Sequence, residues 1–291
     1  MNDGKTWTNV TPPAVTAWSR VTCVEASHSD FNTAYASVDR HQLQDYDPYI
    51  YRTRDQGKTW QRITTGLPAG VYVHVVKEDS VRPGLLFAGT ERGAYVSLDD
   101  GDHWQPLQLN LPVTSVRDFE VYGNDLIVAT HGRGFWVVDD ISPLRQVTDA
   151  ILAQDAYLFK PSDAINVRQG GENGTPLQKD EPQADNPTDG ANIDFYVKAN
   201  ATGVTLEIVD ASGATLQAFS APVDLQPGAA GPPGPGGRAG GIPSTSPLWR
   251  RTPEPFASTA GVHRVTWVPM AGGGRGRGGP GGGGFGRGGG V

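Results

Sequence analysis

The chain has very little cysteine and no long apolar run, and these absences narrow its class. The single cysteine among 291 residues, Cys23, excludes an internal disulfide and matches no zinc-binding pattern. No segment is long and apolar enough to cross a membrane as a helix. The net charge of −7 gives no strong field for nucleic acid. The sequence therefore predicts no membrane span, no nucleic-acid partner, no metal site and no cofactor.

Glycine and proline are abundant instead, and they gather late in the chain. Of the 291 residues, 39 are glycine and 23 are proline. Residues 227–241 are too rich in both, and too poor in apolar side chains, to pack as a core. Residues 271–291 are mostly glycine with three arginines, similar to the RGG segments that bind RNA in other proteins. Because the whole chain is acidic, we predict a low-complexity tail without a nucleic-acid partner.

An eight-residue pattern occurs three times in the first half. Its fullest copy, residues 53–60, reads Thr-Arg-Asp-Gln-Gly-Lys-Thr-Trp, and residues 97–104 read Ser-Leu-Asp-Asp-Gly-Asp-His-Trp. A shorter copy at residues 1–7 has Asn2 in place of the first aspartate. Apolar, β-favouring residues precede the two full copies. The pattern therefore predicts a hairpin turn between two strands.

Each residue type in the pattern has a role in such a turn. An aspartate side chain can accept hydrogen bonds from the turn backbone, and glycine adopts the positive φ that a tight turn needs. The tryptophan restarts a strand and can bury a large ring. These roles predict that six residues are structural rather than catalytic: Asp55, Gly57, Trp60, Asp99, Gly101 and Trp104.

The pattern resembles the Asp-box, or BNR repeat, of sialidase-like and sortilin-like β-propellers. The resemblance covers residues 1 to about 160 and implies an all-β fold of four-stranded blades. The tryptophans Trp7, Trp60 and Trp104 are 53 and 44 residues apart, and 44 residues is about one blade. This span holds about three blades, whereas closed propellers need roughly four to eight. We therefore expect N-terminal blades to be missing, and the piece alone to associate through open sheet edges.

The second half predicts a different module after a polar linker at residues 161–190. Alternating apolar residues predict four strands, at residues 192–199, 204–210, 214–219 and 261–267. The run at 204–213, Val-Thr-Leu-Glu-Ile-Val-Asp-Ala-Ser-Gly, resembles the FlgD-like, immunoglobulin-like modules that follow such propellers. Residues 191–270 are thus predicted to form an incomplete immunoglobulin-like β-sandwich that contains the 227–241 insert.

The loop at residues 130–134 is the sharpest candidate for ligand contact. His131 can exchange a proton near neutral pH, and Arg133 can hold a carboxylate or sugar hydroxyls. Arg92 lies at the same place in the preceding repeat. A structural alternative stays open, in which these side chains form an ion pair between blades with an acid such as Asp118 or Asp139.

Aromatic rings and paired acids are the other features that carbohydrate chemistry requires. Six rings are candidates for stacking on a sugar, although packing between sheets is the simpler role for most: Trp18, Tyr46, Tyr49, Tyr72, Tyr122 and Trp136. Glycosidases need two carboxylates on opposite sides of the scissile bond. No spacing in this sequence marks such a pair, so the catalytic residues stay unassigned.

The resemblance implies two alternative functions. The first is that of an exported, secreted or periplasmic, BNR-repeat glycosyl hydrolase-like protein that acts on or binds carbohydrate. The second is that of a non-catalytic, sortilin-like propeller that binds peptide or polysaccharide. A carboxylate pair facing a groove would separate the two. In both cases we expect the ligand face where first strands begin and where loops join second to third strands, and we expect the isolated piece to be inactive.

Overall fold

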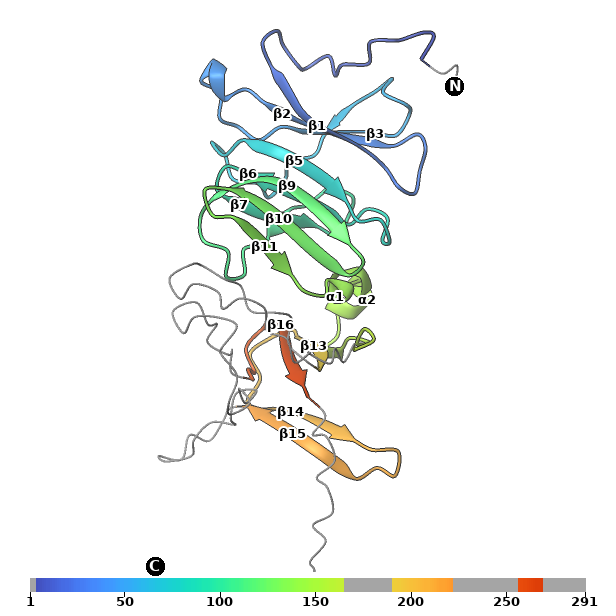
Figure 1. The fold of residues 1–291 in the computed structure, drawn as a ribbon, viewed down its shortest axis with the longest axis vertical. Coiled ribbons are helices and arrows are strands. Elements are labelled where there is room, and N and C mark those ends of the chain that lie inside the picture. Colours follow the sequence, from blue (N-terminus) through green and yellow to red (C-terminus); the bar gives the residue numbers. More distant parts are fainter. Residues whose placement is uncertain (1–3, 165–189, 222–255, 269–291) are drawn as a thin grey trace, which may run out of the picture.

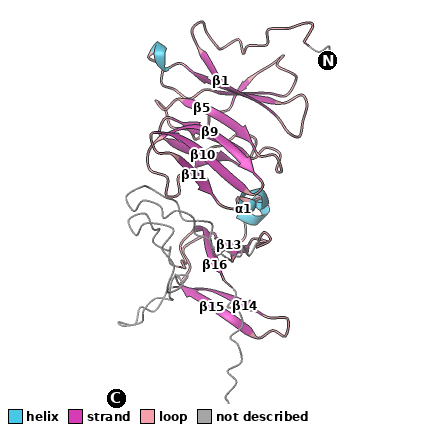
Figure 2. Ribbon diagram, viewed as in Figure 1, coloured by secondary structure: helices cyan, strands magenta, loops and turns pink. Residues whose placement is uncertain are grey.

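The computed structural model describes residues 4–164, 190–221 and 256–268 (Figure 1). Within these ranges the chain is almost entirely β-structure (Figure 2). The few helical segments are short: η1 (His41–Leu43), α1 (Ser142–Gln146) and α2 (Asp149–Leu152). No helix in these ranges is long and apolar enough to cross a membrane. The prediction of an all-β fold is therefore confirmed.

Two antiparallel sheets of four strands follow each other along the chain, each with its strands in sequence order. Sheet 1 contains β1 (Arg20–Ala26), β2 (Ala34–Asp39), β3 (Ile50–Thr53) and β4 (Gln61–Arg62). Sheet 2 contains β5 (Val73–Glu78), β6 (Leu86–Thr90), β7 (Gly93–Ser97) and β8 (Gln105–Pro106). The fourth strands are shorter than the sequence predicts. Before β8 the backbone N–H of Trp104 donates to Thr65, outside its own sheet, so strand pairing begins only at Gln105.

Sheet 3 has three strands, β9 (Ser115–Tyr122), β10 (Asp125–His131) and β11 (Phe135–Val138), in the order β11-β10-β9. The chain then turns away into α1. Among the residues that the structure describes, no fourth strand pairs with β11. The third sheet is therefore built like the first two but stops one strand earlier.

The three sheets stack face to face in the order of the chain (Figure 1). β5 packs against β1 and β2, and β9 packs against β5 and β6. The core between sheets 1 and 2 includes Tyr35, Ile50, Val73, Val76 and Leu86. The core between sheets 2 and 3 includes Leu85, Phe87, Phe119, Leu126 and Val128. Burying such a side chain stabilises the fold by about 1.5–3 kcal/mol, and the arrangement is that of consecutive blades of a partial β-propeller.

The two repeated turns, residues 53–60 and 97–104, share one hydrogen-bond pattern, and we call them box turns. Asp55 Oδ1 accepts from the backbone N–H of Thr59 at 2.8 Å and from the Thr53 hydroxyl at 2.9 Å. That hydroxyl accepts from the backbone N–H of Gly57 at 2.9 Å. Hydrogen bonds from Thr59 lower the pKa of Asp55 to about 2. The carboxylate therefore closes the turn.

The second box turn repeats these bonds. Asp99 Oδ1 accepts from the backbone N–H of His103 and from the Ser97 hydroxyl, both at 2.8 Å. The Ser97 hydroxyl accepts from the backbone N–H of Gly101 at 2.9 Å. Gly57 and Gly101 have φ values of +82° and +87°, a region that side chains with a Cβ resist. Local chemistry alone thus dictates the same turn twice.

Each box turn also forms a hydrogen bond with the preceding repeat, which we call the box contact. The indole N–H of Trp104 donates to the carbonyl of Ile63 at 2.9 Å, and that of Trp60 donates to the carbonyl of Val10 at 2.7 Å. Each acceptor lies three residues after the tryptophan of the previous box copy. The box glycine lies on the same residue, since a Cβ on Gly101 would be 2.4 Å from Ile63 Cδ1. The box contact therefore repeats with the sequence.

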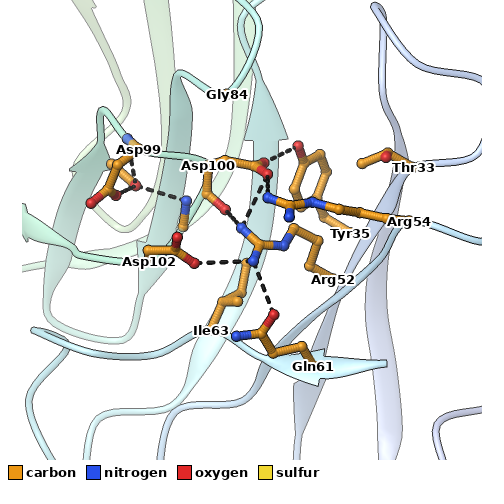
Figure 3. A network of polar contacts seen from close by, with 12 residues as sticks. Thr33, Tyr35, Arg52, Arg54, Gln61, Ile63, Gly84, Asp99, Asp100 and Asp102 are labelled. Atoms are coloured by element: carbon orange, nitrogen blue, oxygen red, sulfur yellow. Dashed lines mark hydrogen bonds and ion pairs between the residues drawn. The ribbon is translucent and has the colours of Figure 1, made fainter. Parts of the chain in front are cut away.

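A buried arginine adds a second tie between sheets 1 and 2 (Figure 3). Arg52 of β3 forms an ion pair with Asp100 (Nη1–Oδ2 3.0 Å) and with Asp102 (Nη2–Oδ1 3.0 Å) in the second box turn. Asp100 also accepts from the Tyr35 hydroxyl and from Arg54, both at 2.5 Å. Burial and this carboxylate raise the pKa of Tyr35 far above its ordinary value. All these groups satisfy one another, which is typical of a structural network.

The second part of the chain contains two smaller antiparallel sheets. One has β12 (Ala156–Leu158), β13 (Ala191–Val197) and β16 (Gly261–Trp267), and the other pairs β14 (Val204–Val209) with β15 (Thr215–Ala221). The immunoglobulin-like sandwich stays a prediction. Most of the predicted linker at 161–190, and all of the 227–241 insert and the 271–291 tail, lie outside the described residues.

Arg264 joins this second part to the end of sheet 3. Its guanidinium donates to the carboxylate of Asp194 on β13 (Nε–Oδ1 2.9 Å) and to the backbone carbonyl of Asp140 (Nη2–O 2.6 Å). Burial raises the pKa of Asp194, and the arginine opposes that rise. The pair fixes β13 and β16 to the point where the chain leaves the stack.

The box contact predicts unequal effects for two tryptophan substitutions. Trp104 is only 5% exposed, so Trp104→Ala should lower the free energy of unfolding by about 3–5 kcal/mol. Trp60 is half-buried, so Trp60→Ala should cost clearly less. Urea denaturation followed by circular dichroism measures both. Equal losses would contradict the difference in burial.

Candidate ligand-binding face

The first strand of each of the three stacked sheets carries a β-bulge at the same place. The pairing of β1 with β2 shifts between Val21 and Cys23, which leaves Thr22 as the extra residue. The equivalent shifts leave His74 extra in β5 and Arg117 extra in β9. A bulge bends its strand and redirects a side chain, and bulges are frequent beside functional sites. The three bulges therefore mark one face of the stack.

The redirected side chains lie next to one another along the stack. The Thr22 and Ser37 hydroxyls are 2.8 Å apart, and the Ser37 hydroxyl donates to the backbone carbonyl of His74 at 3.2 Å. Arg117 Nη1 lies 3.3 Å from His74 Nδ1. The His74 and Arg117 side chains are therefore in contact, and Thr22 is linked to the His74 backbone through Ser37.

Glu91, in the loop between β6 and β7, completes the cluster. Its Oε2 lies 2.7 Å from His74 Nε2 and accepts from the Ser115 hydroxyl at 2.8 Å. Arg117 Nη2 approaches the same oxygen at 3.6 Å. Because a guanidinium can only donate, His74 Nδ1 is the acceptor for Arg117 and His74 Nε2 carries the proton given to Glu91. We call Tyr72, His74, Glu91, Ser115 and Arg117 the bulge site.

The pKa shifts of these groups agree with that assignment. Burial lowers the pKa of His74; the hydrogen bond to Glu91 opposes this, and the positive charge of Arg117 adds to it. Although burial alone would raise the pKa of Glu91, hydrogen bonds from His74 and Ser115 hold it below its ordinary value. Burial and the Glu91 carboxylate raise the pKa of Tyr72. At neutral pH the site therefore holds a neutral imidazole, an ionised carboxylate and a guanidinium.

Aromatic rings extend the bulge site toward solvent. Tyr72 stacks on His41, with ring centroids 4.8 Å apart, and lies edge-on to His74 at 5.0 Å. Tyr46, which is 49% exposed, lies 6.2 Å from Tyr72. Asp39 holds His41 through a contact of 2.7 Å to Nδ1. The insert before β3 thus places ring surfaces beside the charged groups.

The arrangement is suited to holding a ligand rather than to activating a nucleophile. A serine–histidine–acid relay needs the serine on one imidazole nitrogen and the acid on the other. Here Ser115 and Glu91 both lie at His74 Nε2, and Arg117 occupies Nδ1. In the described part of the chain, no three acidic, histidine or cysteine side chains converge as metal ligands. The bulge site therefore offers a ligand a fixed carboxylate and a guanidinium beside aromatic rings.

The residues that the sequence singled out lie on this same face. Arg92 follows Glu91 in the β6–β7 loop and is exposed. His131, the last residue of β10, is opposite Ser115 in the sheet register, and Arg133 follows in the β10–β11 turn. Within the described ranges, neither His131 nor Arg133 has a side-chain hydrogen bond or ion pair, so the ion pair with Asp118 does not form. Their role in ligand contact stays a prediction.

Sequence reasoning missed four residues of the bulge site: His74, Glu91, Ser115 and Arg117. The bulges depend on pairing with the second strand, which no single segment reveals. Glu91 offered one usable signal, because it directly precedes Arg92 in a loop that the repeat had already marked. An acid and an arginine next to each other in a loop that the repeat singles out are a candidate pair for ligand contact.

The other candidate aromatic residues are distributed over the molecule. Trp18 and Tyr122 are 88% and 77% exposed. Tyr49 lies between two guanidinium groups, with Arg62 4.3 Å and Arg40 5.3 Å from its ring centre. The indole of Trp136 donates to the carbonyl of Arg133 at 3.0 Å. Of the six candidates, Tyr72 belongs to the bulge site and Tyr46 lies beside it.

Comparisons with known proteins find weak structural likenesses only. No protein-family model and no curated protein matches the chain. YCF48 bound to D1 peptide is similar at 18% identity and a TM-score of 0.30, over 42% of this chain and 37% of that chain. A GH74 xyloglucanase from Xanthomonas campestris is similar at 15% and 0.33, over 50% and 25%. The GH74 enzyme of Niastella koreensis is similar at 15% and 0.35, over 67% and 29%. The chain thus spans well under half of each of these structures.

The bulge site predicts a defined pH response. The pKa of folded His74 lies below its ordinary value of about 6.5. Protonation therefore favours the unfolded chain, so the contribution of His74 to the free energy of unfolding should fall as the pH drops below about 6.5 and stop falling once the pH is below the folded-state pKa of His74. Arg117→Ala should raise the pKa of His74, and Glu91→Gln should lower it. NMR titration of the imidazole tests both, and shifts of the same sign would contradict the geometry.

Proposed function

We propose that this chain is part of an exported β-propeller protein that binds carbohydrate at the bulge site. The observation that carries the proposal is the exposed ring of Tyr46 beside Tyr72, 6.2 Å away, next to an ionised Glu91. Binding sites for small ligands combine aromatic walls with a few fixed polar groups. A sugar ring stacks on an aromatic face, while its hydroxyls bond to a carboxylate and a guanidinium.

Binding without cleavage is the form of this proposal that the pKa directions favour. A glycosidase needs one carboxylic acid whose pKa is raised, so that it can protonate the leaving group. The pKa of Glu91 is instead lowered by its hydrogen bonds. Asp39, the nearby second acid, is held by His41. Glu91 is therefore ionised and has no proton to give to a leaving group.

The test is a binding panel with a matched pair of tyrosine variants. The whole chain is titrated calorimetrically with soluble polysaccharides and oligosaccharides, and each ligand that binds is repeated with Tyr46→Ala and Tyr122→Ala. Tyr46→Ala should weaken binding about tenfold, which corresponds to about 1.4 kcal/mol. Tyr122→Ala removes a more exposed ring at the opposite end of β9. It should leave the affinity within twofold.

Three outcomes would overturn the proposal. Equal effects of the two substitutions would show that the ligand does not bind at the bulge site. Binding of peptides but of no glycan would favour the alternative, a sortilin-like propeller for peptide ligands. Release of new reducing ends from a bound glycan would show that the protein is a hydrolase.

A further inference from the structure

His74 of the bulge site is surrounded by charged and titratable groups from four parts of the fold. Arg117 of β9 contacts its Nδ1, and Glu91 of the β6–β7 loop contacts its Nε2. Tyr72, which precedes β5, lies edge-on to the ring, and Asp39 at the end of β2 acts on it through its charge. Because His74 is only 6% exposed, a change in its own charge has to be balanced by these neighbours.

The contact between Arg117 and His74 can exist only while the imidazole is neutral. A guanidinium has no acceptor, so Nη1 of Arg117 donates to the lone pair of His74 Nδ1, 3.3 Å away. When Nδ1 binds a proton, it becomes a donor as well. Two cationic groups then face each other with no acceptor between them, and like charges at this distance repel. Protonation of His74 therefore separates the two side chains.

Arg117 is the partner that can move. Its contacts measure 3.3 Å to His74 and 3.6 Å to Glu91. Glu91 is held more closely, at 2.7 Å from His74 and 2.8 Å from Ser115. The side chain of Arg117 is 44% exposed, whereas that of His74 is 5% exposed. Because a protonated imidazole donates more strongly to a carboxylate, Glu91 stays in place and the guanidinium turns to solvent.

We propose that protonation of His74 converts the bulge site into an anion-binding site by releasing Arg117. In the neutral state the charges of Glu91 and Arg117 balance each other. In the protonated state His74 balances Glu91, and the planar donors of Arg117 are left for an oxyanion of a ligand, such as a carboxylate or sulfate group. The exposed Arg92, next to Glu91 in the chain, adds a second positive charge to the same loop. The switch does not depend on the ligand being a sugar.

The causes of the pKa shift of His74 give the direction of the switch. Burial, and also the positive charge of Arg117, hold this pKa below its ordinary value of about 6.5, while Glu91 and Asp39 oppose them. Release of Arg117 removes one of the lowering causes, so His74 has a higher pKa in the released state. A proton therefore favours release as the pH falls below about 6.5. Since the pKa of Glu91 lies below its ordinary value of 4.5, its carboxylate is still ionised when this release begins.

The first experiment follows both side chains by NMR of the whole chain from about pH 8 to pH 5, and to lower pH until the chain unfolds. The heteronuclear NOE of the Arg117 Nε–H group should fall with the same midpoint as the titration of the His74 ring. His74→Asn places an amide oxygen near the position of Nδ1 without a titrating group, so Arg117 should then not respond. Arg20, exposed on β1 outside the site, is the control within each sample. An Arg117 that stays rigid beside a protonated His74, or a His74 that stays neutral until unfolding, overturns the proposal.

The second experiment tests the ligand class with sulfate, whose charge does not change over this pH range. Proton and anion binding are coupled reciprocally, so a protonated site that binds sulfate about tenfold more tightly raises the pKa of His74 by about one unit in saturating sulfate. We expect that rise in the unsubstituted chain, relative to sodium chloride at the same ionic strength. Arg117→Gln removes the released cation and should abolish the rise, although the ring still titrates. An unchanged pKa in sulfate, or an equal rise in Arg117→Gln, contradicts the anion site.

Discussion

The packing of sheet 2 on sheet 1 depends on one contact, the indole N–H of Trp104 on the carbonyl of Ile63 in the preceding repeat. A four-stranded sheet of this size has two apolar faces and is stable only when neighbours cover them. The bond from Trp104 to Ile63 fixes how the second sheet sits on the first, because the glycine of the same turn lies on the same isoleucine. Arg52 then closes the outer side of that interface by pairing with Asp100 and Asp102.

Local features of this fold could be predicted from the sequence, because the residues that decide them are neighbours in the chain. The hairpin at residues 53–60 follows from Asp55 and Gly57 alone, and the strand from Gly261 to Trp267 lies where its alternation placed it. Contacts between repeats could not be predicted in this way. The partners of Arg52 lie 48 and 50 residues away. The pairing of β12 with β13 also joins residues on the two sides of the predicted linker.

The candidate site shows the same difference between features that neighbouring residues decide and features that depend on strand pairing. The repeat directed attention to the loops that border the bulge site, since Arg92 and His131 lie beside Glu91 and Ser115. It did not identify His74 or Arg117, because one extra residue in a strand reverses which side chains share a face. An alternating pattern read without its partner strand assigns such residues to the wrong side. The chemistry of the site therefore depends on information that only strand pairing holds.

The bulges have a consequence for how the chemistry of this face can vary. The same backbone position holds threonine, histidine and arginine in three successive sheets, so the scaffold tolerates a neutral hydroxyl, a titratable ring and a permanent cation there. Each sheet can therefore present a different chemical group at its bulge. Replacing one bulge residue alters charge or hydrogen bonding at a single point, while Trp104, which ties sheet 2 to sheet 1, lies elsewhere. The charge at a bulge can therefore change without removing the indole contact between sheets 1 and 2.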